Sequence, residues 1–138
     1  MKKSLFIAFL LTILFSATSV AQEKNYQLSS HILDINLGKP APGVLISLLR
    51  MNDDQSWSLI EERTTDSNGR VKDFLETAPG TARTGIYKLT YHVSPYFQAQ
   101  NQSTFYPFIE VVFEIKDNNH YHVPITLSPF GYSTYRGN

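Results

Sequence analysis

The sequence contains no cysteine among its 138 residues. Without a thiol the protein has no disulfide bond, no cysteine nucleophile and no thiolate ligand for a metal ion. An excess of one charge is also lacking, because twelve Lys and Arg balance twelve Asp and Glu. Nucleic-acid-binding domains usually carry a basic surplus, so this composition argues against a nucleic-acid partner. The fold must therefore be stabilised by its apolar core, helped by subunit association if an oligomer forms.

Long apolar runs are restricted to the N-terminus. Lys2 and Lys3 precede an apolar run over residues 5–15, and small residues ending in Ala21 follow it. The run is shorter than the roughly 20 residues that cross a bilayer, and the pattern is typical of a secretory signal. We predict a signal peptide over residues 1–21 and one domain over residues 22–138, with formal charge 10 − 12 = −2. We expect an exported protein without membrane attachment, periplasmic if the source is a Gram-negative bacterium.

The remainder of the sequence predicts a mostly-β domain, a sandwich of two sheets. β-branched and aromatic runs alternate with turn segments such as NLGKPAPG and KDNN. One short helix is expected over Ser94–Gln102, with Ser94 as its N-cap and Pro95 at its first position. The expected strands are Gln27–Leu33, Val44–Leu49, Trp57–Thr65, Gly85–His92, Ile109–Ile115, His120–Leu127 and Tyr132–Gly137.

Two of the four histidines lie one residue apart, in the segment HYHVP. Because alternate residues of a strand share a face, His120 and His122 are expected on the outer face, and Tyr121 and Val123 in the core. Two imidazoles on one face suit zinc or copper if a third ligand such as His31 joins them. The pattern alone favours a plainer interpretation, in which both histidines lie on a solvated face without a function.

Hydrolytic chemistry is the other interpretation. A histidine with a pKa of about 6.5 can take a proton from water near neutral pH. Stabilisation of the developing oxyanion requires a cation, which Arg70 in the turn-like segment DSNGRVKD or Arg136 near the C-terminus can supply. Taken singly, Arg70 is expected to be a solvated turn residue. No G-x-S-x-G motif is present, so a serine nucleophile is not predicted.

The C-terminal segment SPFGYSTYRGN is rich in aromatic residues, whereas chain ends are usually polar. An ordinary last strand is one explanation. We favour placement of this terminus at a subunit contact or a pocket.

Four segments together resemble the transthyretin-like 5-hydroxyisourate hydrolases: LSSHILD, GKPAPGV, TTDSNGRV and HYHVPITLSPFGYSTYRGN. They occur in the order of that family and span nearly the whole predicted domain. The last segment is the most specific, because this subfamily ends in Tyr-Arg-Gly-Ser, whereas the hormone-carrying transthyretins lack both that ending and the histidines. The chain departs from the pattern at its last residue, Asn138, where serine is usual.

The resemblance implies a transthyretin-like two-sheet β-sandwich with one short helix. It implies a homotetramer with active sites at the dimer–dimer interface, and no metal or cofactor. The implied reaction is opening of the six-membered ring of 5-hydroxyisourate by water, giving 2-oxo-4-hydroxy-4-carboxy-5-ureidoimidazoline in urate degradation. The family's catalytic residues map onto His31, Arg70 and His122, and its substrate-binding residues onto His31, Arg70 and Tyr135. His120 is interpreted as a solvated edge residue.

The implied roles suit these residue types. His122, with His31, activates or orients the attacking water, Arg70 stabilises negative charge, and Tyr135 closes the pocket. The sequence leaves the division of acid and base roles between the two histidines open. It also leaves two alternatives, namely an exported protein that binds a small ligand without turnover, and a metal protein that uses the histidines.

Overall fold

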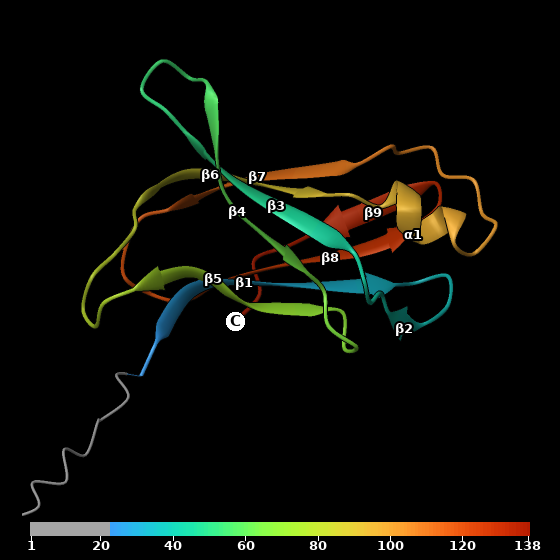
Figure 1. Cartoon of the computed structure of the whole chain (residues 1–138), viewed down its shortest axis with the longest axis horizontal. Helices are drawn as coiled ribbons and strands as arrows, with labels where there is room; N and C mark the ends of the chain where they lie inside the picture. The colour runs from blue at the N-terminus through green and yellow to red at the C-terminus, as the bar shows by residue number, and fades with distance from the viewer. Residues whose placement is uncertain (1–22) are drawn as a thin grey trace, which may run out of the picture.

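The computed structural model describes residues 23–138, which form two β-sheets packed face to face (Figure 1). The predicted signal peptide and its cleavage site lie outside these residues. The described elements are β1 (Asn25–Asp34), β2 (Lys39–Pro40), β3 (Leu45–Met51), β4 (Trp57–Thr64), β5 (Arg70–Thr77), β6 (Gly85–Tyr91), α1 (Ser94–Gln98), β7 (Ile109–Ile115), β8 (Tyr121–Ser128) and β9 (Gly131–Thr134). The expected mostly-β sandwich with one short helix is confirmed.

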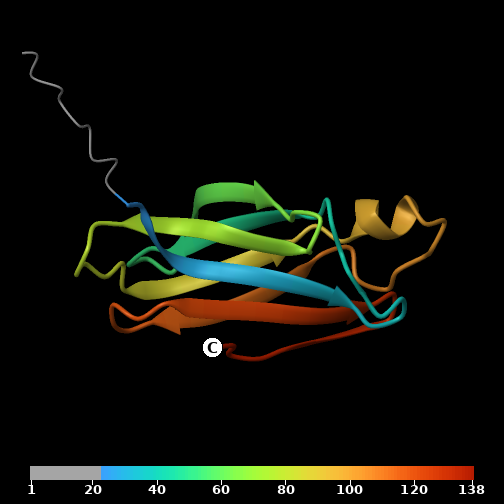
Figure 2. The same ribbon diagram turned by 90° about the horizontal axis from the view of Figure 1, so that it is seen from below.

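The two sheets differ in how their strands pair. In the first sheet, β1 pairs with β5 and β2 along one edge and with β8 along the other, and β9 follows β8. The pairing of β1 with β8 is parallel, whereas every other strand pair is antiparallel. The second sheet has the order β4-β3-β6-β7. Figure 2 shows β5, β1 and β8 side by side, with the C-terminal segment running along β8.

The core lies between the sheets and follows the alternation predicted from the sequence. On β8, Tyr121, Val123, Ile125 and Leu127 are buried, while His122 is only partly buried. The largest fully buried side chains come from both sheets and from α1: Tyr87, Tyr91, Phe74 and Phe97. Burial of such large apolar groups stabilises a fold that has no disulfides.

The sequence interpretation missed β5 and treated its first residue, Arg70, as part of a turn. The strand is hard to identify because its alternation is broken at Leu75, which has a positive φ of 56°. Phe74 and Leu75 are consequently both buried, although adjacent strand residues normally point to opposite faces. The two-residue strand β2 was missed as well.

Two predicted element ends are also wrong. Helix α1 spans only Ser94–Gln98, and Val93 holds the N-cap position without a side-chain cap. The Ser94 hydroxyl instead donates a hydrogen bond to the Pro107 carbonyl at 2.9 Å. The last strand ends at Thr134, and beyond it only a single bridge joins Gly137 to His122. Among residues 23–138, no helix is long and apolar enough to cross a membrane.

Candidate active site

Strand pairing in the first sheet brings together residues that are far apart in the sequence. His31 on β1 pairs with Arg70 on β5, and Ser29, two residues earlier, pairs with His122 on β8. Ser30 and Ile32 are fully buried, so Ser29 and His31 lie on the outer face of β1. The three predicted catalytic residues, His31, Arg70 and His122, therefore come from adjacent strands on one sheet face.

Arg70 is positioned by a tight turn that requires glycine. Gly69 has a positive φ of 67°, and a Cβ atom there would lie 2.6 Å from the Ile32 carbonyl oxygen. The Ile32 amide donates to the Gly69 carbonyl at 2.9 Å, which ties the turn to β1 beside His31. The pairing of Arg70 with His31 thus depends on the absence of a side chain at position 69.

The Asp66 carboxylate stabilises the same turn. It accepts hydrogen bonds from the backbone amides of Asn68 at 2.8 Å and Arg70 at 2.9 Å. The hydrogen bond from the Arg70 amide is the main cause of the lowered pKa of Asp66, and the bond from Asn68 adds to it. Asp66 therefore stays ionised and shapes the loop that carries Arg70.

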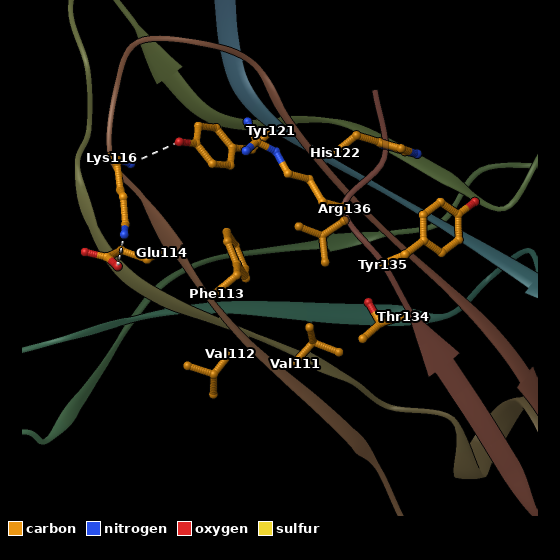
Figure 3. Close-up of a pocket in the computed structure, with 11 residues that line it drawn as sticks. Val111, Val112, Phe113, Glu114, Lys116, Tyr121, His122, Thr134, Tyr135 and Arg136 are labelled. Carbon is orange, nitrogen blue, oxygen red and sulfur yellow. Dashed lines mark hydrogen bonds and ion pairs between the residues drawn. The ribbon is translucent and has the colours of Figure 1, made fainter.

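The C-terminal segment packs against His122. The Gly137 amide donates to the His122 carbonyl at 2.9 Å, and a Cβ atom on Gly137 would lie only 2.4 Å from His122 Cδ2. Glycine at position 137 thus allows the backbone to lie directly on the imidazole. Tyr135 borders the same region and is 60 % exposed, so its ring is accessible to a bound molecule (Figure 3).

Arg136, the second candidate cation, is directed elsewhere. Its guanidinium lies 4.9 Å from the centre of the Tyr121 ring, a residue of the core face of β8 (Figure 3). A cavity of about 410 Å³ opens there between β7 and the C-terminal segment. His122 and Tyr135 line it, but His31 and Arg70 do not. The cavity therefore contains only part of the predicted site, because His31 and Arg70 lie outside it on the open sheet face.

Both predicted catalytic histidines are held in the neutral form. Partial burial, followed by the positive charge of Arg70, lowers the pKa of His122 below its usual 6.5. The same two causes, in the same order, lower the pKa of His31. A neutral imidazole has a lone pair that can accept a proton, so this face can supply a base at neutral pH.

His120 is exposed and lies just before the first residue of β8, as expected of a solvated edge residue, but it also forms side-chain contacts that were not predicted. Its Nδ1 atom lies 2.9 Å from the Tyr26 carbonyl oxygen, and its Nε2 lies 2.7 Å from the Ser29 hydroxyl. The same hydroxyl lies 2.8 Å from Nδ1 of His122. Ser29 thus links the two histidines, a contact that the sequence interpretation missed because it depends on the pairing of β1 with β8.

A metal site of the kind considered from the sequence requires three converging ligands. Within residues 23–138, no group of three or more His, Cys, Asp or Glu side chains is arranged to hold a metal ion. Both ring nitrogens of His120 are engaged in hydrogen bonds.

Comparison with known proteins places the chain in a family. The family model described as HIUase/Transthyretin matches residues 28–137. The chain is 47 % identical to a probable 5-hydroxyisourate hydrolase of Caenorhabditis elegans, covering 99 % of this chain and 98 % of that protein. It is 38 % identical to the 5-hydroxyisourate hydrolase of Salmonella dublin, covering 99 % of each.

Solved structures give the same fold. The 5-hydroxyisourate hydrolase of Klebsiella pneumoniae has a TM-score of 0.66 and 32 % identity, covering 80 % of this chain and 98 % of that one. Sea bream transthyretin in complex with thyroxine has a TM-score of 0.73 and 27 % identity, covering 80 % and 94 %. The expected transthyretin-like sandwich is confirmed, and the chain belongs to the HIUase/Transthyretin family.

Proposed function

We propose that this protein is a 5-hydroxyisourate hydrolase that acts in urate degradation. Water opens the six-membered ring of the substrate, and the product is 2-oxo-4-hydroxy-4-carboxy-5-ureidoimidazoline. The observation that carries the proposal is the meeting of His31, Arg70 and His122 on one sheet face, beside Tyr135. Relatives that carry the hydrolase name at 38 to 47 % identity support it.

His122 is the better-placed base. Its lowered pKa keeps the imidazole neutral at pH 7, and its Nδ1 is occupied by Ser29. That leaves Nε2 to take a proton from water as the oxygen attacks the ring carbonyl. His31 lies on the neighbouring strand, between β5 and β8, and orients the water or the substrate from there.

Arg70 stabilises the charge that develops during the attack. The carbonyl oxygen becomes an oxyanion in the tetrahedral intermediate, and a guanidinium offers several donors in a fixed plane. Asp66 and Gly69 fix the backbone of Arg70, so its side chain starts from a defined position beside His31 before substrate binds. Tyr135 closes the site by stacking on the heterocycle or by donating a hydrogen bond.

The site requires a second subunit to become a pocket. On a single chain the catalytic face is open, and Tyr135 at its border is 60 % exposed. A homotetramer in which two such faces meet would enclose the substrate together with the attacking water and keep bulk solvent out of the site. Sedimentation equilibrium of the mature protein tests this, and a monomer with full activity would contradict it.

The decisive experiment is an absorbance assay with freshly generated 5-hydroxyisourate. The mature protein is expected to accelerate its decay well above the spontaneous rate, and His31→Asn, Arg70→Ala and His122→Asn are expected to abolish most of that acceleration. A wild-type protein that leaves the spontaneous rate unchanged would refute the proposal.

The second candidate is an exported protein that binds a small aromatic ligand without turnover. The TM-score of 0.73 to a thyroxine-bound transthyretin favours it as far as the fold is concerned. Isothermal titration with a non-hydrolysable purine analogue and with thyroxine, beside the decay assay, separates the two. Binding of thyroxine without any turnover of 5-hydroxyisourate would favour this candidate.

We also infer that the protein is exported, on the strength of the charged, apolar and small-residue order of residues 1–21. N-terminal sequencing of the secreted protein should begin at Gln22. Recovery of the full-length chain from the cytoplasm would contradict this inference.

A further inference from the structure

A chain of three hydrogen bonds runs along the edge of the catalytic face. It begins at the Tyr26 carbonyl, 2.9 Å from Nδ1 of His120, and continues through Nε2 of His120 to the Ser29 hydroxyl at 2.7 Å. It ends at Nδ1 of His122, 2.8 Å from the same hydroxyl. All three distances are within the normal range for strong hydrogen bonds.

The chemistry of the partners fixes the direction of every bond when His120 is neutral. A carbonyl oxygen only accepts, so Nδ1 of His120 carries the proton and its Nε2 must accept. The single hydroxyl proton of Ser29 is therefore donated to His120. Ser29 then accepts a hydrogen bond from Nδ1–H of His122, and the lone pair of His122 is on Nε2. These proton positions follow from the network of donors and acceptors.

We propose that Ser29 and His120 are positioning residues for the catalytic base. They hold His122 in the tautomer that leaves Nε2 free, and they provide a path by which the proton taken from water moves on to His120. The inference rests on the proposed hydrolase function only where the reaction is concerned. The tautomer itself is a property of the resting protein.

The proton transfer balances. Nε2 of His122 takes a proton from the attacking water, whose oxygen forms the bond to the ring carbonyl carbon. The Nδ1 proton of His122 passes to Ser29, and the Ser29 hydroxyl proton passes to Nε2 of His120. His122 is then neutral with its proton on Nε2. When that proton is donated to the departing ring nitrogen, the relay runs back: Nε2–H of His120 passes a proton to Ser29, and the Ser29 hydroxyl proton returns to Nδ1 of His122, which restores both resting tautomers. Nε2 of His122 thus serves as base and then as acid, and His120 carries the positive charge only between the two steps.

The position of each group suits this path. Ser29 pairs directly with His122 across the parallel β1–β8 ladder, and His120 precedes His122 by two residues on the same face. His120 is exposed and can exchange its proton with solvent, whereas His122 is partly buried beside Arg70. Placing the charge on His120 rather than on His122 moves it to a group in contact with water, where a charge costs less.

Nitrogen-15 spectroscopy of labelled imidazoles at pH 8 tests the tautomer without substrate. Wild-type His122 is expected to carry its proton on Nδ1, and Ser29→Ala is expected to shift it towards Nε2. Ser29→Thr keeps the hydroxyl and should restore the wild-type spectrum. Ser47→Ala is the matched control, because it removes another hydroxyl 2.8 Å from a histidine, His92, on the second sheet. A wild-type His122 protonated on Nε2 would overturn the proposal.

Kinetics test the path. Ser29→Ala is expected to lower kcat on the order of 10- to 100-fold with little change in KM, the range known for residues that orient a metal-bound histidine. His120→Gln can still accept from Ser29 but not take up a proton, so it should keep the tautomer and lower kcat about tenfold. Wild-type kcat in His120→Gln would overturn the proton path. If the wild-type protein has no activity but His122 shows the Nδ1–H tautomer, only the proposed function fails.

Discussion

The two sheets carry similar pairs of serine and histidine on their outer faces, with opposite chemical consequences. On the second sheet, Ser47 donates to the Glu62 carboxylate at 2.6 Å and lies 2.8 Å from Nε2 of His92. On the first sheet, Ser29 lies 2.8 Å from Nδ1 of His122. Geometry alone does not distinguish the two pairs.

The two pairs differ in the third group that bonds to the serine. Because Glu62 takes the serine proton, Ser47 must accept from His92, and this pair ends at a carboxylate. Within residues 23–138, no carboxylate forms a hydrogen bond with His31, His120 or His122. The largest charge effect on the pKa values of His31 and His122 is that of the Arg70 cation, which lowers both. A nearby cation disfavours the imidazolium, so the histidines beside Arg70 remain neutral bases. The charged group beside a serine–histidine pair thus decides whether the pair ends at a carboxylate or leaves the histidine as a neutral base.

The strongest test of the comparison removes the base. His122→Asn is expected to lower kcat by about 10²- to 10⁴-fold, since that is the usual contribution of a general base. The matched change on the second sheet, His92→Asn, is expected to leave kcat near wild type. Turnover of freshly generated 5-hydroxyisourate measures both, and near-wild-type activity of His122→Asn would contradict the assignment.

Removing the cation should have the next largest effect. Arg70→Ala is expected to lower kcat about 10²- to 10³-fold, as the loss of an oxyanion-stabilising donor does. It also removes a cause of the lowered pKa of both His31 and His122, so the acidic limb of the pH–rate profile should move to higher pH. Arg70→Lys retains the charge and should leave the limb in place while recovering only part of kcat. An unmoved limb in Arg70→Ala would contradict the electrostatic explanation.

The third test displaces the His122 imidazole without replacing it. Gly137→Ala places a Cβ atom where only 2.4 Å separates it from His122 Cδ2, so the imidazole or the C-terminal segment must shift. Because small displacements of a catalytic group are costly, we expect kcat to fall about 10- to 100-fold. The melting temperature should change little, since Gly137 lies at the end of the chain. Full activity in Gly137→Ala would show that the contact does not position the ring.

The lowered pKa values also predict a dependence of stability on pH. In the unfolded chain the histidine pKa values are near 6.5, so just below this pH the unfolded state binds more protons than folded His31 and His122 do. The contribution of these two histidines to the free energy of unfolding is therefore complete above pH 6.5. It is lost as the pH falls from 6.5 to below their folded pKa values. Urea unfolding at pH 8 and pH 5.5 should show a smaller loss of unfolding free energy for a His31→Asn/His122→Asn double variant than for wild type. Equal losses would contradict the pKa directions.

The smallest effect is expected at the last residue. Asn138 is exposed, and both asparagine and serine can form hydrogen bonds. We expect Asn138→Ser to change kcat/KM by no more than about twofold, consistent with surface substitutions of about ±0.5 kcal/mol. A larger gain in the decay assay would show that the terminal residue contacts the substrate.

The sequence by itself determined which way the histidines and core residues of β8 face. Alternation along HYHVP correctly placed His122 outside and Tyr121 and Val123 in the core, because the two-residue period of a strand is a local property. The family-specific segments indicated the sandwich and the candidate residues.

Only the tertiary structure decided what those residues meet. Arg70 begins β5, beside His31, because Gly69 allows the turn to pack against β1. Ser29 and His122 are 93 positions apart, and only the parallel pairing of β1 with β8 joins them and brings His120 within hydrogen-bond distance of Ser29. Strand alternation assigns a face, but register between distant strands depends on the packing of the whole core, which no short segment encodes.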